Sequence, residues 1–169
     1  MPGPMRARIE PICELNDIVP LLADCGLPVA DISAARAPQF FGIRTESGLV
    51  AVIGLELFGA VGLLRSLAVS PAHRGHGLAQ QLVAFAEQLA ASRGVGTLFL
   101  LTTTASAFFG KLGFAPASRS AAPPAIQATP QFSGLCPASS ALLSKSVAAP
   151  GSHSIEPAQP TAQAAEFKP

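Results

Sequence analysis

The chain contains no tryptophan and no tyrosine, so its ten phenylalanines are the only residues of the Phe, Trp and Tyr group. Without tyrosine, no phenolic hydroxyl is available for acid catalysis. Charged residues are also scarce, since they make up 12% of the 169 residues and leave a net charge of +1. This balance argues against a nucleic acid or an acidic membrane surface as a partner.

Long apolar runs are missing as well. No stretch approaches the roughly 20 apolar residues that a membrane-spanning helix needs, and the N-terminal sequence MPGPMRARIEP lacks the apolar core of a signal peptide. We therefore expect a cytoplasmic protein. The three cysteines, Cys13, Cys25 and Cys136, are odd in number and lack metal-ligand spacing. They predict inert thiols in a reducing compartment and no metal cofactor.

Apolar residues form 49% of the chain, enough for one sizeable core. We expect a disordered N-terminus over residues 1–5, one domain over 6–146 and a disordered tail over 147–169. The tail is rich in Ala, Pro, Ser and Gln, a composition that cannot bury enough apolar surface to fold.

Apolar spacing and turn residues predict the elements of an α/β fold with a mixed sheet. The strands at 39–45, 49–57 and 61–69 form an antiparallel meander. A crossover helix then leads to a parallel strand, and helices cover both faces. The expected strands are 6–13, 39–45, 49–57, 61–69, 97–101 and 139–145, and the expected helices start near Asn16 or Asp17, at Leu78 and at Ala105, with one or two helical turns within 125–132.

A basic, glycine-rich loop precedes the helix that starts at Leu78. Glycines allow close backbone approach, and the free N–H groups of a helix start attract an anion, so this loop predicts a phosphate site. A Walker A loop requires Lys and Ser or Thr where Leu78 and Ala79 stand, and a dinucleotide fingerprint requires Gly or Ala where Gln80 stands. Neither motif fits.

What the loop contains is Arg74, Gly77 and Ala79 in the spacing Arg-x-x-Gly-x-Ala, directly after a strand that ends AVSP. This pattern resembles the pyrophosphate loop of the GNAT acetyltransferases, which bind acetyl-CoA. The resemblance extends from about Arg6 to Lys145, and its specific part lies between Leu63 and Phe114. It implies the GNAT fold, acetyl-CoA as co-substrate and a small-molecule amine as acceptor.

The resemblance also implies roles for individual positions. The strand backbone would pair with the pantetheine arm, the loop N–H groups would hold the pyrophosphate with help from an arginine, and two threonines and a phenylalanine would border the arm on the far side. The strand residues are Leu67, Ala68 and Val69. The loop residues are Gly75, His76, Gly77, Leu78 and Ala79, with Arg74 as the arginine. The residues on the far side of the arm are Thr102, Thr103 and Phe109. For His73 and His76, exposure to solvent competes with phosphate contact, and we favour exposure.

One departure from the family concerns the catalytic acid. Many GNAT enzymes place a tyrosine a few residues before the Gly-Phe pair, where this chain has Phe109 in AFFGKLGF. A phenylalanine cannot donate a proton. A thiolate can nevertheless leave near neutral pH, because the pKa of a thiol is about 8.5. The sequence therefore leaves two alternatives open, an acetyltransferase without this acid and a non-catalytic acetyl-CoA-binding module.

Two charged residues interrupt apolar strands. Glu56 is the only carboxylate between Gly48 and Pro71 and is a candidate general base, with a solvent-facing side chain as the alternative. Arg65 is a candidate receptor for a substrate carboxylate, to which a planar guanidinium is suited. If the hairpin pairs about Gly59 and no bulge intervenes, these two side chains point to opposite faces of the sheet.

A narrower resemblance involves the stretches LLRSLAVSPAHRG, LLTTTASAFFGKLGF and AIQATPQFSGLCPASSALLSK. They are similar to GNAT proteins of the arsenic-resistance type, whose relatives acetylate amino-acid-like arsenicals and a phosphinate herbicide. This implies an amino-acid-like acceptor. An arsenic-binding protein that uses the Cys136 thiolate is a further alternative, although burial of this thiol is favoured. The sequence leaves open whether the chain forms a homodimer.

Overall fold

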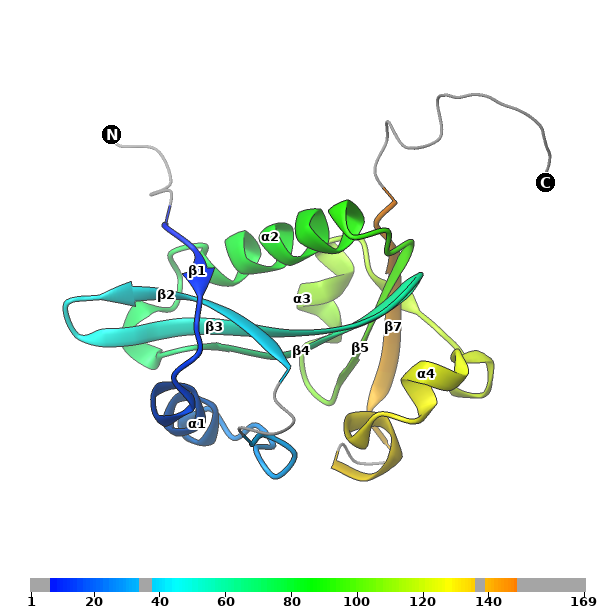
Figure 1. Cartoon of the computed structure of the whole chain (residues 1–169), viewed down its shortest axis with the longest axis horizontal. Helices are drawn as coiled ribbons and strands as arrows, with labels where there is room; N and C mark the ends of the chain where they lie inside the picture. The colour runs from blue at the N-terminus through cyan, green and yellow to red at the C-terminus, as the bar shows by residue number, and fades with distance from the viewer. Residues whose placement is uncertain (1–6, 34–37, 136–138, 149–169) are drawn as a thin grey trace.

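A computed structural model describes residues 7–33, 38–135 and 139–148 of the chain. The described residues form a seven-stranded mixed sheet in the order β1-β2-β3-β4-β5-β7-β6, with α2 and α3 on one face and α1 and α4 on the other (Figure 1). The predicted α/β fold class and its helices on both faces are confirmed. The predicted N-terminal disorder over 1–5 and most of the predicted tail, 149–169, lie outside the described residues.

The strands and helices have the following bounds. The strands are β1 (Glu10–Pro11), β2 (Gln39–Thr45), β3 (Gly48–Phe58), β4 (Val61–Val69), β5 (Thr97–Thr102), β6 (Ala115–Pro116) and β7 (Ala141–Ser146). The α-helices are α1 (Leu15–Asp24), α2 (Leu78–Ser92), α3 (Ser106–Lys111) and α4 (Pro124–Gln127), with short turns η1 (Pro71–His73), η2 (Arg119–Ala121) and η3 (Gln131–Leu135).

The centre of the sheet matches the prediction. Strands β2, β3 and β4 form an antiparallel meander, and β4 pairs in parallel with β5. The crossover helix α2 packs on one face through Leu82, Val83, Ala86 and Ala90, all at most 1% exposed. Burial of an apolar helix face of this kind is the main force that fixes a helix on a sheet.

The ends of several elements differ from the prediction. Strand β1 is only two residues long, so the strand expected over 6–13 is largely wrong. Helix α1 starts at Leu15 after Glu14, ahead of the expected cap residues. Helix α3 starts after Ala105 instead of Thr104, and the hydroxyl of Thr102 accepts the Ala105 N–H at 2.9 Å. Thr102, Thr103 and Thr104 can all make local bonds of this kind, so the sequence alone does not show which of them does.

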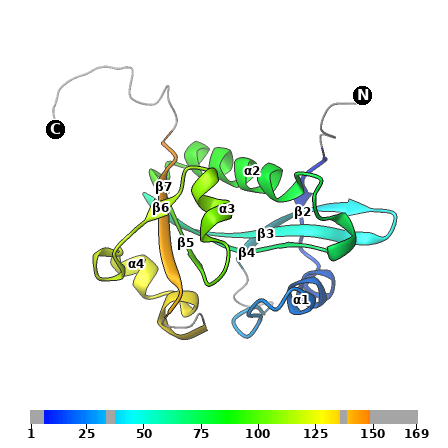
Figure 2. The same cartoon turned by 180° about the vertical axis from the view of Figure 1, so that it is seen from behind.

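The two remaining differences concern the C-terminal part of the sheet. Strand β7 inserts between β5 and the short edge strand β6, a pairing that no local pattern indicates; Figure 2 shows this edge from behind. Val147, assigned by prediction to the tail, is 8% exposed and donates its N–H to the Gly96 carbonyl at 2.9 Å. The packed domain therefore extends to at least Val147.

Candidate functional site

The two parallel strands at the centre of the sheet separate part of the way along. Between β4 and β5 the pairing covers only Val61↔Thr97 to Leu63↔Phe99. Beyond this point β5 continues to pair with β7 through Thr102, whereas β4 has no further strand partner on that side among the described residues. The edge of β4 from Leu64 onward is therefore open.

A β-bulge coincides with this separation. Val52 is paired with Ala68, but Gly54 is paired with Arg65, so β4 carries one extra residue opposite Ile53. Ser66 lies in this bulge with φ of 56°, the only non-glycine residue with positive φ in the described chain. A bulge redirects the backbone groups of its strand and here increases the divergence of β4 from β5.

Two adjoining cavities occupy the opening. One, of about 470 Å³, lies between the separated strands, and its walls include Leu64, Leu100, Thr102, Thr103 and Phe109. The other, of about 610 Å³, lies at the end of β4 and the start of α2. The two share the lining residues Leu27, Leu67, Ala105 and Phe108. These shared residues make the cavities neighbours, one at the start of α2 and the other between the strands.

The start of α2 has the geometry of an anion site. Gly75 and Gly77 have φ values of 82° and 79°, in the left-handed region that side chains disfavour. Gly77 is the N-cap residue of α2 and has no side chain that could cap the helix, and the first residues of α2, Leu78 and Ala79, line the larger cavity. The N–H groups of this first turn carry the positive end of the helix dipole.

Arg74 is held beside this helix start. Its Nε donates a 2.9 Å hydrogen bond to the Val69 carbonyl, and its Nη2 lies 3.6 Å from the Cys25 thiol. The side chain is exposed and lines the larger cavity. His73, whose Nδ1 lies 2.8 Å from the Ser70 hydroxyl, also lines this cavity.

The coenzyme-binding residues implied by the sequence converge on these two cavities. The larger cavity is lined by Leu67, Ala68, Val69, Arg74, Gly75, Gly77, Leu78 and Ala79, and the smaller by Thr102, Thr103 and Phe109. His76 is exposed and is the one predicted residue that lines neither. Their roles in binding stay predictions, because lining a cavity does not identify a ligand.

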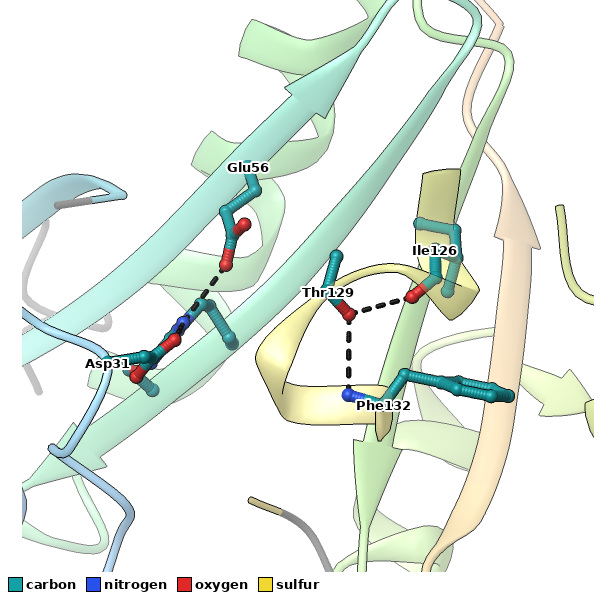
Figure 3. A network of polar contacts seen from close by, with 7 residues as sticks. Asp31, Glu56, Ile126, Thr129 and Phe132 are labelled. Carbon is teal, nitrogen blue, oxygen red and sulfur yellow. Dashed lines mark hydrogen bonds and ion pairs between the residues drawn. The ribbon is translucent and has the colours of Figure 1, made fainter. Parts of the chain in front are cut away.

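The two charged residues of the strands meet in an ion cluster. Arg65 Nη1 donates a 2.9 Å hydrogen bond to Glu56 Oε2, and the guanidinium also binds both carboxylate oxygens of Asp31, with a 2.8 Å contact to Oδ1. Figure 3 shows the carboxylates of Asp31 and Glu56 facing each other across this contact. Burial lowers the pKa of Arg65, but the hydrogen bonds and charges of these carboxylates outweigh burial and raise it.

The prediction that Glu56 and Arg65 point to opposite faces is therefore wrong. The β3–β4 hairpin pairs Phe58 with Val61 across a two-residue turn, which pairs Glu56 with Leu63 and Gly54 with Arg65. Residues paired in this way share a face, so both side chains lie on the face covered by α1 and α4. The expected pairing about Gly59 was one residue out of register.

Several lining residues gave no sequence signal. Asp31 follows α1 in a segment that the sequence left ambiguous, and Cys25 and Leu27 come from the end of α1. Gln131 and Ser140 reach the smaller cavity from the C-terminal part of the chain. Only long-range packing brings them there. Two charges in apolar strands, Glu56 and Arg65, were the one signal of a buried ion pair.

None of the described helices is long and apolar enough to cross a membrane. Within the described residues, no group of three or more His, Cys, Asp or Glu side chains is arranged to hold a metal ion. The predicted thiol Cys136 lies outside the described residues.

Comparison with known proteins gives consistent matches. Residues 12–114 match the model of the Acetyltransferase (GNAT) family. The amino-acid acetyltransferase of Pseudomonas fluorescens (strain Pf0-1) is 31% identical over 117 residues, which cover 66% of this chain but 27% of that protein. The chain thus spans about a quarter of the length of the curated relatives that it matches.

Solved structures show the same fold. N-acetylglutamate synthase from Neisseria gonorrhoeae, complexed with coenzyme A and N-acetyl-glutamate, superposes with a TM-score of 0.69 at 22% identity, covering 85% of this chain and 35% of that one. The ribosomal-protein-S18-alanine N-acetyltransferase from Escherichia coli superposes with a TM-score of 0.61 at 15% identity, covering 88% and 98% of the two chains.

Proposed function

Because the chain belongs to the GNAT acetyltransferase family, we propose that it transfers the acetyl group of acetyl-CoA to the amine of a small, amino-acid-like acceptor. The observation that carries this proposal is the open edge of β4 beyond the Leu63↔Phe99 pair. An extended arm that enters this opening meets unpaired strand backbone on one side and apolar wall on the other.

The coenzyme would lie along the two cavities. Its pyrophosphate would accept hydrogen bonds from N–H groups between Gly75 and Ala79, beside the positive charge of Arg74. Its pantetheine arm would follow Leu67, Ala68 and Val69, with Thr102, Thr103 and Phe109 on the far side. The solved synthase from Neisseria gonorrhoeae, which has the same fold, is complexed with coenzyme A, and this likeness supports the placement.

The transfer itself requires a neutral amine. Glu56 would accept one proton from the ammonium group of the acceptor. The free amine nitrogen then forms a bond to the thioester carbonyl carbon, the carbon–sulfur bond breaks, and coenzyme A leaves with the electron pair as a thiolate. The new amide nitrogen loses its extra proton to water. Strand N–H groups near Leu67 would stabilise the oxyanion.

No residue replaces the tyrosine acid in this scheme. Phe109 is 7% exposed and packs edge-on against Phe108 and Phe114 at centroid distances of 5.1 and 5.7 Å. It therefore contributes shape and apolar contact. The thiolate leaves unassisted, because a thiol with a pKa of about 8.5 is a good leaving group near neutral pH.

The acceptor class rests on similarity. The curated relatives are named amino-acid acetyltransferases, and the narrower resemblance to arsenic-resistance GNAT proteins suggests amino-acid-like arsenicals and a phosphinate herbicide as further acceptors. A role in arsenic or xenobiotic resistance, a cytoplasmic location and a homodimer are parts of this proposal that need separate tests.

An acetyl-transfer assay tests the proposal. The purified chain is mixed with acetyl-CoA, a thiol reagent and a panel of amines that contains amino acids, their amides, basic alkylamines and hydroxylamine. We expect coenzyme A release that depends on both the protein and the amine, and an acetylated amine by mass spectrometry. Coenzyme binding without release with any amine would instead favour the non-catalytic binding module.

A further inference from the structure

Arg65 lies between two cavities, one proposed for the coenzyme and one that opens beside Glu56. Its side chain is 1% exposed and lines the cavity between β4 and β5. It also lines a third cavity, of about 280 Å³, whose walls include Asp31, Glu56, Pro38 and Pro130. The first of these cavities is the proposed place of the coenzyme arm, so the third cavity offers the acceptor a separate approach to Glu56.

Every nitrogen of this guanidinium has a partner. Nη1 binds both Glu56 and Asp31, Nη2 binds Asp31 Oδ1 at 2.8 Å, and Nε donates to the hydroxyl of Ser66 at 3.0 Å. Asp31 thus forms a bidentate ion pair with the guanidinium, and the two parallel hydrogen bonds of such a pair fix the orientation of both groups. The guanidinium in turn presents one Nη1 hydrogen to Glu56 at 2.9 Å, which fixes the direction of that carboxylate.

The charges of the cluster do not cancel. Asp31, Glu56 and Arg65 are the only charged residues among the described residues that line these two cavities. Two carboxylates and one guanidinium leave a net charge of −1. Such a site attracts an ammonium ion and offers no unpaired cation to a carboxylate. The predicted role of Arg65 as the receptor of a substrate carboxylate therefore competes with its contacts to Asp31 and Glu56.

We propose that the Asp31–Arg65 pair positions Glu56 for proton removal, and that the acceptor is a basic amine that arrives as an ammonium ion through the cavity lined by these carboxylates. The inference rests on the proposed function, with Glu56 as the base. Arg65 and Asp31 are positioning residues, since they act on the acceptor through Glu56. The reaction is the one written above, with Glu56 taking the first proton.

The test compares two acceptors that differ in basicity. A basic alkylamine must lose a proton before it attacks, whereas hydroxylamine is already uncharged at neutral pH. We expect Arg65→Met to lower kcat for the alkylamine by at least about tenfold, to lower kcat for hydroxylamine much less, and to leave the Kd for coenzyme A unchanged. Arg65→Lys restores part of the loss, because it returns the charge without the bidentate fork.

Arg44 provides the matched control. It also lies among carboxylates, with contacts to Asp17 at 3.1 Å and Glu14 at 2.6 Å, but its side chain is 30% exposed and lines none of the three cavities. We expect Arg44→Met to leave kcat for both acceptors unchanged.

If Arg65→Met does not fold, a second variant tests whether the Asp31–Arg65 pair positions Glu56. Asp31→Asn keeps the shape of the side chain and removes its charge. We expect it to lower kcat for the alkylamine in the wild-type background and to have no further effect in a Glu56→Gln background, as required of residues that act as one unit.

Two outcomes overturn the inference. Equal losses with the alkylamine and hydroxylamine would indicate a structural role only. An Arg65→Met variant that raises KM for an amino acid, but not for the corresponding amide, would identify Arg65 as the receptor of a substrate carboxylate. Both outcomes leave the acetyl-transfer proposal intact, whereas a wild-type chain that acetylates no amine contradicts that proposal together with the inference.

Discussion

Leu63 and Phe99 form the last pair between β4 and β5, and each proposed role for the coenzyme depends on where that pairing stops. On the paired side of Leu63 the sheet is continuous and closed. On the other side, the bulge at Ser66 and the pairing of β5 with β7 leave one edge of β4 open. The site is thus a local interruption of the sheet at its centre.

Replacement of the proposed base is the first prediction. Glu56→Gln keeps the size of the side chain and cannot accept a proton, so we expect kcat for a basic amine to fall by about 10²–10⁴-fold. The Kd for coenzyme A, measured by calorimetry, should not change. Glu46→Gln, in the exposed β2–β3 turn, is the control. A Glu56→Gln variant with wild-type kcat would remove Glu56 from the mechanism.

The second prediction concerns the missing acid. Phe109→Tyr supplies a hydroxyl at the position where many family members have one. If the thiolate leaves unassisted, kcat changes by less than about tenfold at neutral pH, because the leaving group needs no proton. Steady-state kinetics with acetyl-CoA measures this change. A gain of about a hundredfold or more would show that acid catalysis limits the natural chain.

A buried hydroxyl supports the third prediction. Ser140 is 3% exposed, and its Oγ has no hydrogen-bond partner among the described residues. A buried polar atom without a partner costs about 1–3 kcal/mol. We therefore expect Ser140→Ala to keep or raise the free energy of unfolding in urea, by up to about 1–3 kcal/mol.

The neighbouring residue is the control for this variant. Ser139 is exposed, and Ser139→Ala should change the free energy of unfolding by less than about 0.5 kcal/mol. A clear loss of stability in Ser140→Ala would mean that its hydroxyl makes a contact in solution.

Local patterns were sufficient to predict the elements on either side of the glycine-rich loop that precedes α2. The apolar period of α2 and the glycines before it predicted a helix start at Leu78, which the structure has. The continuous apolar run at Thr97 predicted a central strand parallel to β4, which is also confirmed. These features depend on residues close together in the chain, where spacing and burial determine conformation.

Strand register and long-range pairing could not be predicted from local sequence patterns. The one-residue difference between a turn centred on Gly59 and a turn of Gly59 and Ala60 moved Arg65 to the other face of the sheet. The bulge at Ser66 carries no glycine to mark it. Asp31 reaches Arg65 across 34 residues, and only the packing of α1 on the sheet brings the two together.

The most direct measurement of the central claim is calorimetric titration of the full chain with coenzyme A, compared with two glycine variants. Gly77→Val and Gly59→Val both place a side chain at a positive φ, 79° and 68°, with no neighbour within 4 Å of the new Cβ. Gly77 begins α2 at the larger cavity, and Gly59 lies in the β3–β4 turn. We predict that the wild-type chain and Gly59→Val bind coenzyme A, whereas Gly77→Val loses at least about tenfold in affinity, because strain at this position moves the N–H groups that we propose as donors to the pyrophosphate. No affinity in the wild-type chain, or equal affinity in both variants, would contradict the account.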